Sequence, residues 1–115
     1  MIDVKETKNV KEVSKKLFKI LKNYKLNFYV CSFSYKFISY FKEKYKIKSG
    51  LIINNLINKK HIENNLDFNS ISYKYKNKIP NKETFRWTVN DTKEVTNENI
   101  ITDNPKLIYD FIKNS

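Results

Sequence analysis

Histidine and cysteine, the side chains most versatile in acid–base, nucleophilic and metal chemistry, occur once each in this chain. His61 is the only histidine, which excludes a metal site built on a pair of histidines and any two-histidine catalysis within one chain. Cys31 is the only cysteine, so no disulfide can form within the chain. Because Cys31 lies in an apolar run, its surroundings favour a small buried side chain over a nucleophile.

Lysine dominates the charge of the chain. There are 22 lysines and one arginine, Arg86, and the formal net charge is +11. Such a charge favours a polyanionic partner, whether nucleic acid, anionic lipid or a phosphorylated substrate. The alternative is a compositional origin, because Lys, Asn, Ile and Tyr are abundant, Gly occurs once and Ala is absent, as expected of AT-rich coding DNA. Taken alone, the net charge is explained better by this compositional origin than by a polyanionic partner. The single arginine also disfavours a protein that reads nucleic-acid bases.

The length of 115 residues predicts one domain, less than half of the roughly 250 residues of a complete eight-stranded β/α barrel. No apolar run approaches the roughly 20 residues that a membrane-spanning helix needs. Met1 leads directly into a short strand through Ile2 and Val4, with no visible signal peptide. A cytoplasmic location is therefore the expectation.

Helices and strands alternate in the first half of the chain. Asn9 and Glu12 fit a capping pair at the start of a helix over about residues 10–24. Leu26–Phe33 is almost continuously apolar, which is typical of a buried parallel strand. Ser34 can cap a second helix. The expected core face of that helix comprises Phe37, Ile38, Phe41 and Tyr45.

The second half is richer in strands. After Gly50, strands are expected at Leu51–Asn54, through Ile71, Tyr73 and Tyr75, through Phe85, Trp87 and Val89, and at Asn99–Asp103. A weak helix over residues 55–64 and a loop at Lys76–Lys82 separate the earlier strands. The last helix follows Pro105, is capped by Asp103 or Asn104, and turns Leu107, Ile108, Phe111 and Ile112 inward. Because the late connections are short, this half is either a trimmed parallel barrel or antiparallel.

Four segments, in order, resemble the glycerophosphodiester phosphodiesterase family. Ile2–Lys5 (IDVK) is similar to the family's strand ending in Glu-x-Lys, and Cys31–Phe33 (CSF) to its strand ending in Ser-Phe. Arg86–Asp91 (RWTVND) resembles the Trp-Thr-Val-Asn strand of the family. Ile100–Pro105 (IITDNP) resembles the closing Ile-Ile-Thr-Asp-x-Pro. The resemblance extends over nearly the whole chain.

The resemblance implies an α/β fold, a truncated or degenerate TIM-type β/α barrel of about six strands whose helices are reduced in the C-terminal half. The site would lie at the carboxyl ends of the strands. Family members hydrolyse glycerophosphodiesters, usually with a divalent metal such as Mg²⁺ or Ca²⁺. The His-Arg-Gly and Glu-x-Asp motifs of the first two barrel strands are missing here, so six of eight strands remain.

The resemblance also implies roles for particular residues. Lys5 matches the phosphate-facing lysine of the family, and Trp87 matches its substrate-side aromatic residue. The alternation of Trp87 with Phe85 and Val89 favours a barrel-core position equally. Asn90 is a candidate ligand contact, with strand-end capping as the alternative. Independently of the resemblance, Arg86 is a candidate anion contact together with Lys5 and surface lysines. Asp3 replaces the glutamate that would bind the metal. No catalytic residue can be assigned.

The first functional hypothesis is a glycerophosphodiester phosphodiesterase-like protein of lipid metabolism that is inactive as this chain alone. The second is a non-enzymatic module that binds a phosphate-bearing small molecule, and the third is a basic nucleic-acid binder. Loss of two barrel strands would leave two open sheet edges, which predicts a homo-oligomer or a partner chain that supplies the missing strands.

Overall fold

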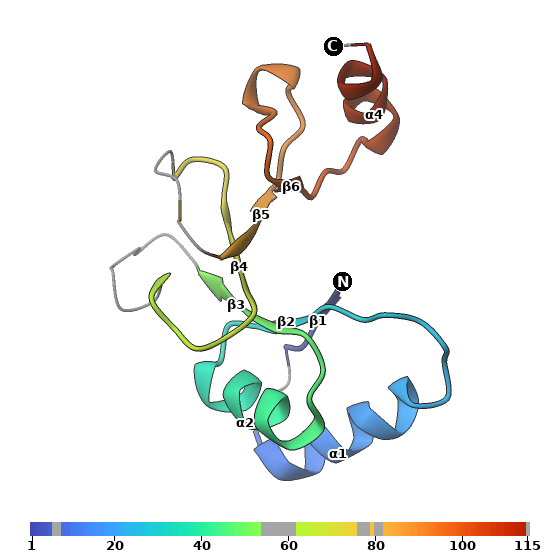
Figure 1. Ribbon diagram of the computed structural model, residues 1–115, viewed down its shortest axis with the longest axis vertical. Helices are drawn as coiled ribbons and strands as arrows, with labels where there is room; N and C mark the ends of the chain where they lie inside the picture. Colours follow the sequence, from blue (N-terminus) through green and yellow to red (C-terminus); the bar gives the residue numbers. More distant parts are fainter. Residues whose placement is uncertain (6–7, 54–61, 76–78, 80–81, 115) are drawn as a thin grey trace.

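The computed structural model describes residues 1–5, 8–53, 62–75, 79 and 82–114 (Figure 1). Within this part of the chain, six strands form one sheet in the order β1-β2-β3-β4-β5-β6, and every neighbouring pair is parallel. The strands are β1 (Ile2–Asp3), β2 (Val30–Ser32), β3 (Ser49–Ile53), β4 (Phe68–Ser72), β5 (Glu83–Trp87) and β6 (Asn99–Ile100).

Spatial order that follows sequence order distinguishes a β/α barrel from a doubly wound sheet, in which the order reverses at a switch point. The sheet curls into a half-barrel, so the predicted truncated α/β barrel is confirmed. The C-terminal half of the sheet stays parallel, and the antiparallel alternative is wrong.

The two longest helices among the described residues lie in the first half of the chain. Helix α1 (Val10–Leu21) and helix α2 (Tyr35–Tyr45) pack against each other, and α2 also packs against β2 and β3 (Figure 1). Between β5 and β6 there is only the short 3₁₀ helix η1 (Thr92–Glu94). The core between the helices and the sheet consists of Leu21, Val30, Phe37, Ile38, Phe41, Leu51, Ile53, Leu66, Ile71 and Ile79.

A second core fills the inner, concave face of the half-barrel. Phe68 is fully buried there and meets Tyr29 and Phe85 at ring-centroid distances of 5.7 and 5.2 Å. Cys31, Ile52 and Trp87 complete this cluster. Since successive residues of a strand face opposite sides, the inner set lies one residue out of phase with the helix-facing set.

The predicted caps of the first two helices differ in outcome. Ser34 caps α2 as expected, since its Oγ accepts a hydrogen bond of 3.1 Å from the backbone N–H of Phe37. The expected cap at Asn9 is wrong, because Asn9 is left-handed (φ 56°) and its side chain makes no capping hydrogen bond. Helix α1 ends at Leu21, since Asn23 and Tyr24 continue only as turns bonded to the carbonyls of Ile20 and Leu21.

The last helix, α4 (Pro105–Lys113), begins at the predicted proline and is capped by Asn104, whose Oδ1 accepts from the N–H of Leu107 at 3.3 Å. The expectation that four apolar residues turn inward is wrong for three of them. Ile108 alone is buried, while Leu107, Phe111 and Ile112 are exposed. The reason is that α4 projects away from the sheet and contacts η1 (Figure 1).

Strand boundaries differ from the expectations at several ends. The apolar run Leu26–Phe33 contributes only its last part, β2, to the sheet, and Tyr73 and Tyr75 lie beyond β4. The weak helix at 55–64, His61 and most of the loop at 76–82 fall largely or wholly outside the described residues. No helix in the described part of the chain is long and apolar enough to cross a membrane.

Candidate functional site

The carboxyl ends of the six parallel strands meet at one rim of the half-barrel, and the inner side of that rim is where a β/α barrel binds its ligand. Asp3 pairs in register with Cys31 of β2 and so shares the inner face with it. Lys5 follows two residues later and is exposed. Trp87 ends β5 and belongs to the inner-face cluster. Asp3 and Trp87 thus share the inner face of the sheet, with β2, β3 and β4 between β1 and β5. Their levels differ, because the register through Cys31, Gly50 and Phe68 sets Asp3 beside Glu83 at the start of β5, four residues before Trp87.

Trp87 carries an unusual feature at this rim. Its indole Nε1–H is buried and has no hydrogen-bond partner among the described residues. A buried donor without an acceptor typically costs about 1–3 kcal/mol, so native proteins rarely retain one without a reason. The indole nitrogen can only donate, so an acceptor oxygen would satisfy it, and because the nitrogen is buried a ligand oxygen reaches it only when neighbouring side chains move aside.

Asn90 lies just beyond β5 and joins it to the turn that follows β6. Its Oδ1 accepts hydrogen bonds of 3.0 Å from the Thr102 hydroxyl and from the backbone N–H of Asp103, and its Nδ2 donates to the Asp103 carboxylate at 3.2 Å. The amide of Asn90 is therefore engaged in holding the start of the connection to α4. These bonds agree with the alternative role of Asn90, in which its side chain caps the end of the strand and does not contact a ligand.

Arg86 lies on the opposite face of β5 from Trp87. It is buried, its Nε pairs with Glu98 Oε1 at 2.9 Å, and its Nη1 donates to the carbonyls of Tyr75 at 2.5 Å and Ser72 at 3.4 Å. The guanidinium also lies 5.7 Å from the Tyr75 ring centroid. The structure does not bring Arg86 together with Lys5 and Trp87, because adjacent residues of a strand point to opposite faces.

The residues present do not fit a divalent metal. A hard cation takes about six oxygen ligands, several of them carboxylates. Asp3 is the only carboxylate of β1, and among the described residues no group of three or more His, Cys, Asp or Glu side chains could hold a metal. Glu83, an inner-face carboxylate at the same register level, lies four strands away and pairs with Lys48.

Cys31 is the residue closest in register to Asp3, and it is not available as a nucleophile. Burial, reinforced by the negative charge of Asp3, raises the pKa of the Cys31 thiol to about 12. The thiol is therefore protonated at neutral pH, and its Sγ–H donates to the carbonyl of Ile2 at 3.5 Å. Ser32, its neighbour, donates to the carbonyl of Val4 at 2.9 Å and joins the first two strands.

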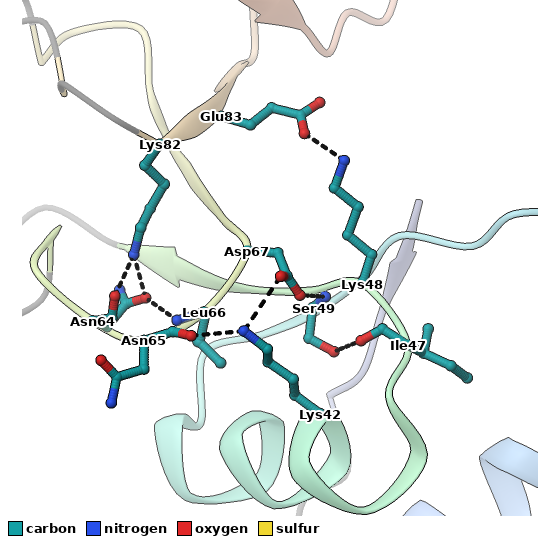
Figure 2. Close-up of polar contacts among 10 residues, drawn as sticks. All are labelled: Lys42, Ile47, Lys48, Ser49, Asn64, Asn65, Leu66, Asp67, Lys82 and Glu83. Carbon is teal, nitrogen blue, oxygen red and sulfur yellow. Dashed lines mark hydrogen bonds and ion pairs between the residues drawn. The ribbon is translucent and has the colours of Figure 1, made fainter.

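A polar network at the opposite, amino ends of the strands was not predicted from the sequence (Figure 2). Asp67 precedes β4, and its carboxylate accepts from the backbone N–H of Ser49 at 2.9 Å and pairs with Lys42 at 3.3 Å. Lys48 pairs with Glu83 at 2.7 Å and approaches the Tyr29 hydroxyl at 3.2 Å. The sequence signal that could have revealed this network is the charged residue directly before each of these strands. These contacts connect the starts of β3, β4 and β5, a position associated with stability in barrels.

Lys82 extends this network. Its Nζ donates to the backbone carbonyl of Asn64 at 2.6 Å and to Asn64 Oδ1 at 2.8 Å, while Asn64 Nδ2 donates to the buried Asn69 at 3.0 Å (Figure 2). Partial burial, together with the positive charge of Lys42, lowers the pKa of Lys82. Its neutral hydrogen-bond acceptors indicate a structural lysine that fixes the segment before β4.

Comparison with known proteins yields no assignment: no protein-family model matches the chain, and no curated protein matches it.

Proposed function

We propose that this chain is a glycerophosphodiester phosphodiesterase-like half-barrel that binds a phosphate-bearing small molecule at the carboxyl rim of its sheet and does not hydrolyse it alone. The observation that carries the proposal is the buried, unpartnered indole N–H of Trp87 on the inner face of that rim. Lys5, exposed just beyond β1, supplies a positive charge at the other side of the half-barrel. Support also comes from the sequential parallel order of the strands, which agrees with the fold that the resemblance implies.

Hydrolysis of a phosphodiester needs an acid near the leaving oxygen and neutralisation of charge on the phosphoryl oxygens. Of the described side chains at β1, Asp3 is the only carboxylate and Lys5 the only cation. Asp103, beyond β6, is hydrogen-bonded to Asn90, and the Cys31 thiol stays protonated. General acid–base groups each contribute about 10²–10⁴-fold to such reactions. The rim thus has groups that recognise an anion but lacks a pair that would cleave it.

We expect glycerol 3-phosphate to bind weakly, with a dissociation constant in about the millimolar range, because few groups converge on the rim. NMR titration gives a direct readout, since Trp87 is the only tryptophan and yields a single indole N–H signal. That signal should shift on binding. Trp87→Phe, which keeps an aromatic ring but removes the donor, and Lys5→Ala should both weaken binding.

Lys16→Ala is the matched control, because Lys16 is exposed on α1 and pairs with Glu12 on the same helix. It should leave the affinity unchanged. An indole signal that does not move, with small shifts distributed over surface lysines, would refute the proposed site. Metal-dependent turnover of glycerophosphocholine by the purified chain would refute the absence of catalysis.

The proposal includes completion of the sheet by further strands. The hydrogen bonds of β1 to β2 use the N–H groups of Ile2 and Val4, so the N–H of Asp3 points to the open edge. Strand β6 is the other edge of the sheet. A second copy, or another chain that supplies the missing strands, can pair with these edges.

We expect self-association that rises with protein concentration in sedimentation experiments. Asp3→Pro, which removes the outward N–H of β1, should weaken it, whereas Asp3→Ala, which keeps that N–H, should not. A monomer at all concentrations, with slow amide exchange in both β1 and β6, would show that these edges need no partner.

A further inference from the structure

The charge of the chain is unevenly distributed. No acidic side chain occurs between Glu12 and Glu43, a run of 30 residues that contains seven lysines. Residues 83–115, by contrast, carry four basic and six acidic side chains. The uneven placement of the acids, more than that of the lysines, therefore makes the α1–α2 half of the molecule strongly positive.

Exposed apolar side chains lie at one end of this positive half. Ile20, Tyr24 and Leu26, at the end of α1 and in the segment that leads back to β2, are 57%, 58% and 69% exposed. Exposed lysines alternate with them in the sequence. We call this set the α1-end patch, and it comprises Lys19, Ile20, Lys22, Tyr24, Lys25 and Leu26.

A groove of about 440 Å³ adjoins the patch. Lys22 and Leu26 lie on its wall, together with Lys46 and Lys48 from the α2–β3 connection. Its apolar lining is Phe18, Leu21, Phe28 and Ile47. The groove thus repeats the character of the patch, with apolar walls and ammonium groups at its margin. It lies at the amino ends of β2 and β3, away from the carboxyl rim.

We propose that the α1-end patch is a docking surface for an anionic lipid bilayer. Apolar side chains next to lysines suit a membrane interface, where the apolar groups enter the headgroup region and the ammonium groups meet lipid phosphates. Nucleic acid suits the patch less well, because the only arginine, Arg86, is buried against Glu98 and cannot contact bases or stack on them. This inference does not rest on the carboxyl-rim site.

The experiment is co-sedimentation of the chain with vesicles of phosphatidylcholine, with and without phosphatidylserine. Binding should require phosphatidylserine and weaken as salt rises. The triple variant Lys19→Gln, Lys22→Gln, Lys25→Gln should bind about a hundredfold more weakly, since each lysine near an anionic surface contributes about a fivefold factor. The triple variant Ile20→Ser, Tyr24→Ser, Leu26→Ser should lose at least about tenfold.

The matched control replaces three apolar residues of α4, where the surrounding charge is slightly negative. Leu107, Tyr109 and Phe111 are 42%, 64% and 42% exposed, so their change to serine removes a similar apolar surface and should leave vesicle binding unaltered. Because all substituted side chains are exposed, circular dichroism should show unaltered folding for every variant.

Three outcomes would overturn the proposal. Equal binding to pure phosphatidylcholine would remove the role of charge, and equal loss in the α4 control would remove the role of the patch. Tighter binding to a single-stranded oligonucleotide than to phosphatidylserine vesicles, unaffected by the apolar triple variant, would assign the surface to nucleic acid instead. Failure of the glycerol 3-phosphate titration would leave all these results unchanged, because the two sites lie at opposite ends of the sheet.

Discussion

Gly50→Ala should lower the free energy of unfolding by about 2–4 kcal/mol, with a fall in melting temperature of about 10–15 °C. Gly50 lies on the inner face of β3 beside Phe68, its register partner on β4. A Cβ at this position would lie less than 3.0 Å from three ring atoms of Phe68. The ring cannot move aside easily, since it is fully buried against Tyr29 and Phe85.

The control is a double-mutant cycle with Phe68→Ala. In that background the ring is gone, and Gly50→Ala should be neutral or stabilise by up to about 1 kcal/mol, because alanine restricts the unfolded chain more than glycine does. Chemical denaturation of the four proteins gives the coupling energy. If Gly50→Ala costs the same amount with and without the Phe68 ring, the collision is not the cause.

The second large effect is expected at Arg86. Arg86→Lys should cost about 2–3 kcal/mol, because a lysine cannot reproduce the fork that bonds Glu98 and the carbonyls of Ser72 and Tyr75 together. Glu98→Gln should cost a similar amount, because it leaves the guanidinium charge buried without its carboxylate. Denaturant titration measures both.

Two controls separate structure from function at this position. Glu83→Gln breaks the more exposed pair with Lys48 and should lower stability much less than Glu98→Gln does, because solvent screens this pair. Folded Arg86→Lys should keep the glycerol 3-phosphate affinity of the unchanged chain, since Arg86 faces away from the rim. A loss of affinity without a loss of stability would assign Arg86 to the binding site after all.

Local sequence signals predicted most elements of the fold. The helices around α1 and α2, the Ser34 cap and the proline at the start of α4 follow from short-range preferences, which the folded chain retains. Strand lengths were predicted less well, because pairing depends on the neighbouring strand. The run Leu26–Phe33 is almost continuously apolar, yet only Val30 and Cys31 pair in register with strands on both sides.

In the candidate site, too, local sequence predicts some features, and contacts between distant segments determine the others. Alternation along β5 places Trp87 inside and could also have placed Arg86 outside, but the anion-binding hypothesis assigned both residues to one site. The bonds of Asn90 to Thr102 and Asp103, and of Lys82 to Asn64, join segments distant in the sequence, which no local pattern reveals. The exposure of α4 depends likewise on the absence of a neighbour for its apolar side.

The spatial order of the strands also bears on how the chain is made. Each strand pairs with the strand synthesised immediately before it, and the earliest pairing, Ile2 with Val30, joins residues only 28 positions apart. A nascent chain can therefore form β1, α1 and β2 as soon as they leave the ribosome and then add each later strand to the existing edge. The half-barrel needs no late step that joins its first strand to its last, the most distant pairing of a closed barrel and the costliest in loop entropy.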